Sequence, residues 1–320
     1  MFITKKTKNQ NKSKINNTLA TKKQNINYNN KHNNNNDNNN NTLSILSFNI
    51  YSRGCKDFSN TLVDKMLNDN NIDILCTQED GETNAYKPIQ KYNILPVIKN
   101  KYCGNKQPET VGVYEKIPNS VVFDNCINSN QVYKDKQINR YSIICNYKNI
   151  KIANLHLEGG RYTDQILLTD FDTLLPIKLS LLELIIKQQP DIILGDFNSV
   201  YCSNKILLNK FLEGQYTYFE NAVKQSKLTQ KDKSNIKKWN MAPFILLKKY
   251  GYTYAKPQNE NTVITNGRGQ SIIDFIFYKK HKLILNETNI VNIISKNDSY
   301  KDYKCISDHN PIYSKFTIKQ

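Results

Sequence analysis

Apolar runs rich in β-branched and aromatic residues recur from residue 42 to the end of the chain, and they restrict the fold more than any other feature. Gly, Pro and Asn separate these runs, as is typical of turns between strands. No helical stretch interrupts residues 92–157, so we predict a sheet-rich protein with mostly antiparallel pairing there. The runs are TLSILSFNI (42–50), IDILCTQED (72–80), YNILPVI (92–98), TVGVYEK (110–116), SVVFDN (120–125), RYSIICNY (140–147), KIANLHL (151–157), PDIILGDFN (190–198), SIIDFIFYK (271–279), LILNETNIVNII (283–294) and SDHNPIYSKFTI (307–318).

Helical spacing of apolar residues is found in fewer places. Residues 58–67 have it, with Asp57 as a candidate N-cap, so a helix is expected between the first two strands. Thr163–Gln189 is expected to be the longest helical region, with Pro176 either kinking it or starting a second helix. The lysine-rich residues 224–240 are interpreted as a surface insertion. Together the pattern predicts an α/β (α+β) sandwich of two packed mixed sheets flanked by helices.

The N-terminal residues differ sharply from the rest of the chain. Residues 1–41 are rich in Asn and Lys and contain KHNNNNDNNNN, so they have too little apolar surface to offset the entropy of ordering them. We predict a disordered arm over residues 1–41 and one domain over residues 42–320. The arm holds eight lysines and one aspartate, a net charge of +7. Two interpretations stay open: a solvated tail, or loose contact with a polyanion.

Charge and cysteine content limit the class of protein. The formal charge is +17, but 41 of the 45 basic residues are lysine, a bias that AT-rich coding produces by itself. The charge is therefore compatible with a nucleic-acid partner without requiring one, and nothing indicates an obligate protein partner. Seven cysteines without a CxxC pair favour an intracellular location, cytoplasmic or nuclear, rather than secretion. No apolar run approaches the roughly 20 residues needed to cross a bilayer, so no membrane insertion is expected.

Ionisable side chains occur where several predicted strands end. His156 is near the end of KIANLHL, Glu79 follows ILCTQ, and Asp196 follows IILG. Asp274 lies inside IIDFIF, where an unpaired carboxylate is costly to bury, so it needs a histidine or a metal as partner. Taken singly, each of these residues is also compatible with an ordinary turn or surface role. Taken together, they predict charges gathered at the rim of a core.

Six short motifs occur in chain order: Ser47–Ile50 (SFNI), Gln78–Glu79 (QE), Asn154–Leu157 (NLHL), Gly195–Asn198 (GDFN), Ile273–Ile276 (IDFI) and Ser307–His309 (SDH). Together they resemble the motifs of the endonuclease/exonuclease/phosphatase superfamily, which has the DNase I-like fold. GDFN and SDH are fairly specific, and the other four motifs are weak alone. The resemblance spans residues 47–311 and implies a four-layer sandwich with a Mg²⁺-assisted phosphoesterase site, Mn²⁺ being an alternative metal.

The resemblance also implies roles for the metal and for the attacking water. Glu79 and Asp308, with the amide of Asn49, are the implied metal ligands, in keeping with the preference of Mg²⁺ for oxygen. Asp196 and Asn198 are implied to bind or orient the water, with Asp196 as a candidate base. Tyr51 occupies a position where several nuclease members have a second polar residue, which puts a second metal site in doubt.

Histidines and arginines are the implied phosphate contacts. His309 is implied to contact the scissile phosphate while Asp274 holds it, and His156 is a second phosphate ligand or a proton donor to the leaving oxygen. HLEGGR is similar to the HLExxR stretch of tyrosyl-DNA phosphodiesterases, so Arg161 is a candidate phosphate contact, or else a surface residue starting a helix. Arg268 either replaces an arginine that many members have beside the ID-[YF]-I motif, or lies in an exposed hairpin.

Aromatic residues between GDFN and Asp274 offer a further possibility. Trp239, Tyr252 and Tyr254 lie where substrate loops insert in this fold, and aromatic rings there can stack on bases. The chain has twenty tyrosines, so an interior packing role is the preferred interpretation.

The sequence thus predicts a metal-dependent enzyme that hydrolyses phosphodiesters in nucleic acid, as a nuclease or a DNA-end-processing phosphodiesterase. Histidine at position 156 disfavours an abasic-site endonuclease, because those enzymes usually have tyrosine there. One alternative is a phosphatase of inositol phosphates or other small phosphoesters, although their lysine-rich phosphate-binding segment has no convincing counterpart. The other is a catalytically silent binding module, which the intact set of acids disfavours, since acids without a metal repel phosphate.

Overall fold

The computed structural model describes residues 41–50, 60–80, 93–94, 111–134, 136–159, 168–223, 227–267, 269–294 and 307–320. All of these residues belong to the unit Asn41–Gln320. The predicted arm lies outside them except for Asn41, the residue before the first strand.

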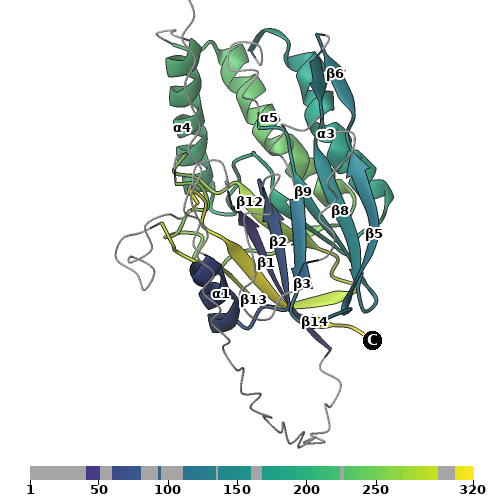
Figure 1. Ribbon diagram of the computed structural model, residues 1–320. Helices are drawn as coiled ribbons and strands as arrows, with labels where there is room; N and C mark the ends of the chain where they lie inside the picture. The colour runs from purple at the N-terminus through teal and green to yellow at the C-terminus, as the bar shows by residue number, and fades with distance from the viewer. Residues whose placement is uncertain are drawn as a thin grey trace, which may run out of the picture. The chain divides into compact units, whose positions relative to one another are not determined.

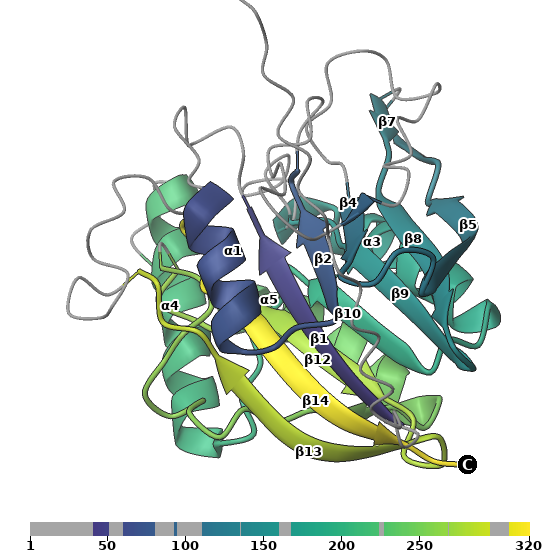
Figure 2. The ribbon, with the colours of Figure 1, turned by 60° about the horizontal axis from the view of Figure 1, so that its bottom comes forward.

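One six-stranded sheet is built around the N-terminal strand. In spatial order it contains β13 (Leu283–Ile290), β14 (Ile312–Ile318), β1 (Thr42–Asn49), β2 (Ile74–Gln78), β4 (Val111–Glu115) and β3 (Asn93–Ile94). β1 and β2 pair in parallel, and the other neighbours pair antiparallel. Figure 2 shows β13, β14, β1 and β2 side by side, with the last two strands of the chain next to the first.

A second six-stranded sheet packs against the first. It contains, in spatial order, β11 (Thr253–Tyr254), β12 (Asp274–Tyr278), β10 (Ile192–Asp196), β9 (Ile150–His156), β8 (Tyr141–Tyr147) and β5 (Val121–Asn128). β9 and β10 pair in parallel, and the remaining pairs are antiparallel. The described residues also contain a small two-stranded sheet of β6 (Gln131–Tyr133) and β7 (Lys136–Ile138). The mostly antiparallel, mixed pairing agrees with the prediction.

Alternation along β1 explains the layers. Leu43 and Ile45 join the core shared with the second sheet, whereas Leu46 and Phe48 pack on the opposite face with helix α1 (Asn60–Asp69). Helices α3 (Phe171–Lys187), α4 (Lys205–Val223) and α5 (Gln230–Lys249) lie on the other side of the molecule, and residues of α3 and α5 pack on the second sheet (Figure 1). The arrangement is the predicted one of two mixed β-sheets flanked by helices.

The helix predictions have different outcomes. Residues 163–167 of the predicted region Thr163–Gln189 lie outside the described residues, and α3, the helix within that region, has 17 residues, whereas α4 and α5 have 19 and 20. Residues 230–240, assigned to a surface insertion, form the first half of α5, and a capping box of Thr229 and Asp232 starts this helix. Pro176 lies inside α3, as its sixth residue, so it does not start a second helix, which leaves the predicted kink as the other alternative.

Among the helices that the structure describes, none combines the length and the apolar character needed to cross a membrane.

Candidate active site

Strand register brings the motif residues to one edge of the two sheets. The parallel pair β1/β2 ends with Asn49 opposite Gln78, and the parallel pair β9/β10 ends with His156 opposite Asp196. The antiparallel neighbour β12 begins at the same edge, with Asp274 opposite Asp196. Because parallel strands end on the same side of a sheet, polar residues far apart in the sequence become neighbours here.

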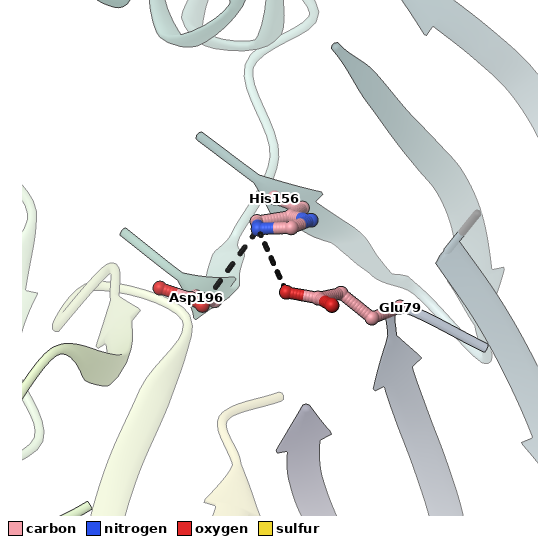
Figure 3. Close-up of side chains that lie close together, drawn as sticks. All are labelled: Glu79, His156 and Asp196. Carbon is pink, nitrogen blue, oxygen red and sulfur yellow. Dashed lines mark ion pairs between the residues drawn. The ribbon is translucent and has the colours of Figure 1, made fainter. Parts of the chain in front are cut away.

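Glu79, His156 and Asp196 form the first cluster, here called the Glu79 group (Figure 3). His156 Nε2 lies 3.8 Å from Glu79 Oε1 and 3.7 Å from Asp196 Oδ2. The Asn49 amide joins the two acids, because its Nδ2 donates to Asp196 Oδ2 at 2.8 Å and to Glu79 Oε1 at 3.3 Å. His156 and Asp196 are only 4% and 1% exposed, so these charges interact with little screening by water.

Asp196, Asp274 and His309 form the second cluster, the His309 group. His309 Nδ1 is 2.9 Å from Asp274 Oδ2, and Asp274 is buried. His309 Nε2 lies 3.9 Å from Asp308 Oδ1. Asp196 belongs to both groups, so the two clusters form one continuous site.

The environment of this site shifts two protonation equilibria. Burial, followed by the nearby charge of Asp274, raises the pKa of Asp196 to about 7. Burial by itself disfavours protonated His309, but Asp274, then Asp196 and Asp308, outweigh it and raise the pKa of His309 to about 10. Both shifts arise because like and unlike charges are held close together away from water.

Backbone conformation at the strand ends is also unusual. Glu79 and Asn198 have left-handed φ values of 51° and 45°, which cost a non-glycine residue of order 1–3 kcal/mol. Asn198 donates two hydrogen bonds that help to hold it there. Its backbone N–H donates to Asp196 Oδ1 at 2.7 Å, and its Nδ2 donates to the Leu157 carbonyl at 3.0 Å. Such strain persists where the surroundings enforce it, and it is common at functional sites.

Gly195 explains why the GDFN segment begins with glycine. Its φ is 137°, and a Cβ at this position would lie 1.9 Å from the Leu155 carbonyl oxygen on the neighbouring strand. No side chain fits there without moving the backbone, so Gly195 lets β10 approach β9 and bring Asp196 beside His156.

The comparisons with known proteins agree with this arrangement. A family model described as the Endonuclease/Exonuclease/phosphatase family matches residues 46–309. The chain belongs to the endonuclease/exonuclease/phosphatase family. Members of this family are phosphoester hydrolases that generally depend on a divalent metal. The search of curated proteins finds no match.

Solved structures share the fold at low sequence identity. A 3'-5' exonuclease from Neisseria meningitidis is similar at a TM-score of 0.53 and 15% identity, covering 85% of this chain and 98% of that one. An endonuclease/exonuclease/phosphatase family protein from Bacteroides thetaiotaomicron is similar at a TM-score of 0.51 and 13% identity, covering 87% of this chain and 98% of that one. These likenesses show a common DNase I-like fold.

The donor set of this family member suits a divalent cation. Glu79, Asp196 and His156 offer ligand atoms within 4.8 Å of one another, and Asp196, Asp274 and His309 do the same. Among the described residues, no group donates a hydrogen bond to the buried Asp274 Oδ1. Carboxylates crowded together away from water repel one another, and a hard cation with oxygen ligands relieves that repulsion.

Two of the metal ligands implied by the sequence, Asn49 and Asp308, are not arranged as ligands in the structure. Asn49 turns its amide nitrogen toward Glu79 and Asp196, so a ligand role requires rotation of this amide. Asp308 contacts the His309 ring but, within the described part of the chain, belongs to neither group of closely spaced ligands. Arg161 and Arg268, the candidate phosphate contacts, lie outside the described residues.

Several motif residues turn out to support the site without facing it. Gln78 of the first sheet donates from Nε2 to Asn154 Oδ1 of the second sheet at 2.6 Å and to Ser47 Oγ at 3.2 Å. Ser307 donates to the Asn49 carbonyl at 2.6 Å and accepts the backbone N–H of His309 at 3.0 Å. The sequence showed that these residues belong to motifs, but it did not show which motif residues stabilise the site and which take part in the reaction.

Of the aromatic residues considered for base stacking, Trp239 and Tyr252 are buried, and Tyr254 is partly buried against the core. Trp239 is 4% exposed, and Tyr252 is 5% exposed and donates to the Pro190 carbonyl. Tyr254 packs edge-on against Phe275. This agrees with the preferred interpretation that these rings belong to the core.

Proposed function

We propose that the chain is a divalent-metal-dependent phosphodiesterase that acts on nucleic acid, as a nuclease or as a DNA-end-processing enzyme. The observation that carries the proposal is that one buried carboxylate, Asp196, joins an acid-rich group around Glu79 to the histidine–carboxylate pair of His309 and Asp274. A site of this kind has charges for a metal on one side and an oriented imidazole for a phosphate on the other.

The attacking water belongs to the GDFN loop in this proposal. Asp196 accepts the proton of the water as general base, and Asn198 orients the water. The hydrogen bonds from Asn49 Nδ2 and from the Asn198 backbone N–H fix both oxygens of the Asp196 carboxylate, which supports this assignment. A carboxylate held at both oxygens is already positioned before substrate binds, so little reorganisation is needed during reaction.

The histidines act on the phosphate. Asp274 binds His309 at Nδ1, which leaves Nε2 to donate to a phosphate oxygen. His156 is a second phosphate ligand or the proton donor to the leaving oxygen, and its contact with Asp196 keeps it beside the water. Arg161 and Arg268 are proposed as further phosphate contacts.

Glu79 and Asp308 would hold Mg²⁺, or Mn²⁺ in its place. Asn49 would be an additional ligand after rotation of its amide, and Asp196 would then keep the hydrogen bond from the Asn198 backbone N–H. Carboxylate oxygens are the ligands that these hard cations prefer, which supports the choice. When bound, the cation neutralises charge on the phosphate.

Nucleic acid is preferred over a small polyphosphate because of the cations near the site. An inositol phosphate has several phosphates close together and needs several cations to hold them. Of the described residues, Lys178 donates to backbone carbonyls and Arg140 pairs with Glu158 at 2.9 Å. Cations already bound to the protein are poorly suited to hold further phosphates, whereas a single scissile phosphodiester needs fewer of them. The chain's net charge of +17 is compatible with a polyanion and adds only weak support, because the lysine bias also follows from AT-rich coding.

An assay of the purified chain with Mg²⁺ on single-stranded DNA, duplex DNA, RNA and inositol polyphosphates tests the proposal. We expect hydrolysis of at least one nucleic acid that stops when the metal is chelated. Turnover of inositol polyphosphates alone would overturn the choice of substrate. Absence of turnover, combined with retained ligand binding in Asp196→Ala and His309→Ala variants, would favour a silent binding module.

A further inference from the structure

Lys178 is a buried lysine on α3, a helix outside all six family motifs. Its side chain is 1% exposed, and its Nζ lies 2.9 Å from the carbonyl oxygen of Glu158 and 2.9 Å from that of Asn198. A third carbonyl, that of Phe197, is 3.4 Å away. An ammonium group has three N–H donors, so it can satisfy all three oxygens.

The two loops joined by this lysine both carry site residues. Glu158 is two residues after His156, and Asn198 is two residues after Asp196. The side chains of His156 and Asp196 are themselves 3.7 Å apart. A single Nζ therefore joins the loop after β9 to the loop after β10, in addition to the bonds from Leu157 N–H to the Asp196 carbonyl and from Asn198 Nδ2 to the Leu157 carbonyl.

We propose that Lys178 is a positioning residue, which holds the β9 and β10 loops together so that His156, Asp196 and Asn198 keep their reactive arrangement. The inference rests on the proposed phosphodiesterase function and names a residue that acts through others, without touching the substrate.

Lys178 stabilises the strained backbone conformation of Asn198. Asn198 has a left-handed φ, and its carbonyl accepts from Lys178 while its side chain donates to Leu157 in the other loop. Gly159 leaves room for the Asn198 side chain, because a Cβ at this position would lie 2.7 Å from Asn198 Oδ1. Loss of the Lys178 bonds removes restraints from a conformation that other parts of the fold must enforce.

The lysine is costly to bury, which argues for a role that offsets this cost. Burial lowers the pKa of Lys178 to about 7, against the opposing effects of Glu158 and Asp196. The Trp239 ring of α5 covers the amine, with its centroid 4.5 Å from Nζ. Arg140 holds the side chain of Glu158 at 2.9 Å, so this residue is bound through its backbone on one side and its carboxylate on the other.

Replacement of the lysine tests the proposal through kinetics. Lys178→Met keeps the length of the side chain and removes its donors, and Lys187→Met, an exposed lysine at the end of the same helix, is the matched control. We expect Lys178→Met to lower kcat on the preferred oligonucleotide by about 10- to 100-fold with KM changed less than about threefold, and Lys187→Met to leave both unchanged. Lys178→Gln retains amide donors and should recover part of kcat. It also serves if the methionine variant folds poorly.

A double-mutant cycle separates positioning from general destabilisation. Asn198→Gly removes the side chain that Lys178 is proposed to position, and glycine accepts the left-handed φ. We expect Lys178→Met to cost much less in the Asn198→Gly background than in the wild type, because the two residues act together. Equal, additive losses in kcat would show that Lys178 does not act through Asn198 and would overturn its proposed positioning of that residue.

Hydrogen exchange gives a readout that does not depend on activity. Amides of residues 157–159 and 197–199 should exchange faster in Lys178→Met than in Lys187→Met, while the core strands keep their protection. Faster exchange in a protein that hydrolyses no phosphodiester would refute the proposed function and retain the restraint by Lys178. Unchanged exchange in these loops would refute the restraint whatever the activity.

Discussion

The two ends of strands β9, β10 and β12 carry very different sets of ionisable groups. At one end, His156, Asp196 and Asp274 are buried side by side. At the other end, an open cavity of about 1020 Å³ is lined largely by lysine, asparagine and glutamine side chains, together with Asp191 and His281. The same three strands thus connect a small, buried cluster of acids and imidazoles with a wide cavity of mixed polar and apolar lining.

The difference teaches that desolvated like charges, and not hollow volume, mark the candidate active site. In the cavity, Asp191 accepts the backbone N–H of Lys151, and Lys279 donates to the Tyr250 carbonyl, so these groups stabilise the ends of strands β9, β10 and β12. At the other edge, Asp196 faces Asp274, and burial with this neighbour raises the pKa of Asp196. The repulsion between two buried carboxylates is relieved when a metal ion binds between them or when one of them takes up a proton.

The largest expected difference in activity is between substitutions at the two ends of β10. Asp196→Asn keeps the size of the side chain and removes the proposed base, so we expect phosphodiester hydrolysis to fall by about 10³-fold or more. Asp191→Asn changes the same residue type at the cavity end and should leave kcat within about twofold, because its contact is with backbone. Steady-state kinetics on one oligonucleotide compares the two, and equal losses would remove the distinction between the ends.

The histidines give the next contrast. His309→Gln removes an imidazole held by Asp274, and we expect a loss in kcat of about 10²-fold. His281→Gln removes an exposed imidazole that lines the cavity and should have no effect on kcat. Full activity of His309→Gln would contradict the proposed phosphate contact, while a loss in His281→Gln would point to a role for the cavity in catalysis.

Much of this edge could be predicted because strands impose simple rules. An apolar run that ends in an acid predicts a strand that brings a charge to the rim of the core, and Glu79 and Asp196 follow that rule. Asp274 reaches the same edge in another way, because it begins the antiparallel strand β12. Parallel pairing then aligns the ends without any knowledge of side-chain contacts. The sandwich and the neighbourhood of the site residues were within reach of the sequence for this reason.

The supporting contacts could not be predicted, because they depend on how layers approach one another. The bond from Gln78 to Asn154 joins the two sheets, and the bonds of Lys178 join a helix to two loops. The helix α5 was missed because its first half is rich in lysine, although Thr229 and Asp232 provided a capping signal. Lysine-rich composition obscured the apolar face that Ile236 and Trp239 contribute to the core.

The affinity for a metal ion also distinguishes the acidic edge from the cavity, because a carboxylate can be removed at either end. Glu79→Gln removes a proposed ligand at the acidic edge, and we expect it to weaken Mn²⁺ binding by about tenfold or more. Glu183→Gln removes a carboxylate that lines the cavity and should leave that affinity unchanged. Calorimetric titration of Mn²⁺ into each variant measures both, and chelation of the metal should abolish hydrolysis in all active variants. Loss of affinity only in Glu183→Gln would place the metal at the wrong end.

The smallest effect is one of stability, and it concerns the lysine behind the acidic edge. The ordinary pKa of lysine is 10.5, and burial lowers the pKa of Lys178 in the folded chain to about 7. Below pH 7 both folded and unfolded states hold the proton. Between about pH 7 and 10.5 the unfolded state binds it and the folded state increasingly does not, so the free energy of unfolding rises with pH in this window.

The Lys178→Met variant lacks this contribution. Urea unfolding at pH values on either side of 7 should therefore show the wild type gaining stability relative to the variant as pH rises, by at most about 1.4 kcal/mol per pH unit. Lys187→Met controls for the loss of one positive charge from α3. A stability difference between wild type and Lys178→Met that stays constant or shrinks with rising pH would mean that the buried amine keeps its proton. In that case Lys178 would stay positively charged near Asp196 and would act on it through this charge as well as through its hydrogen bonds.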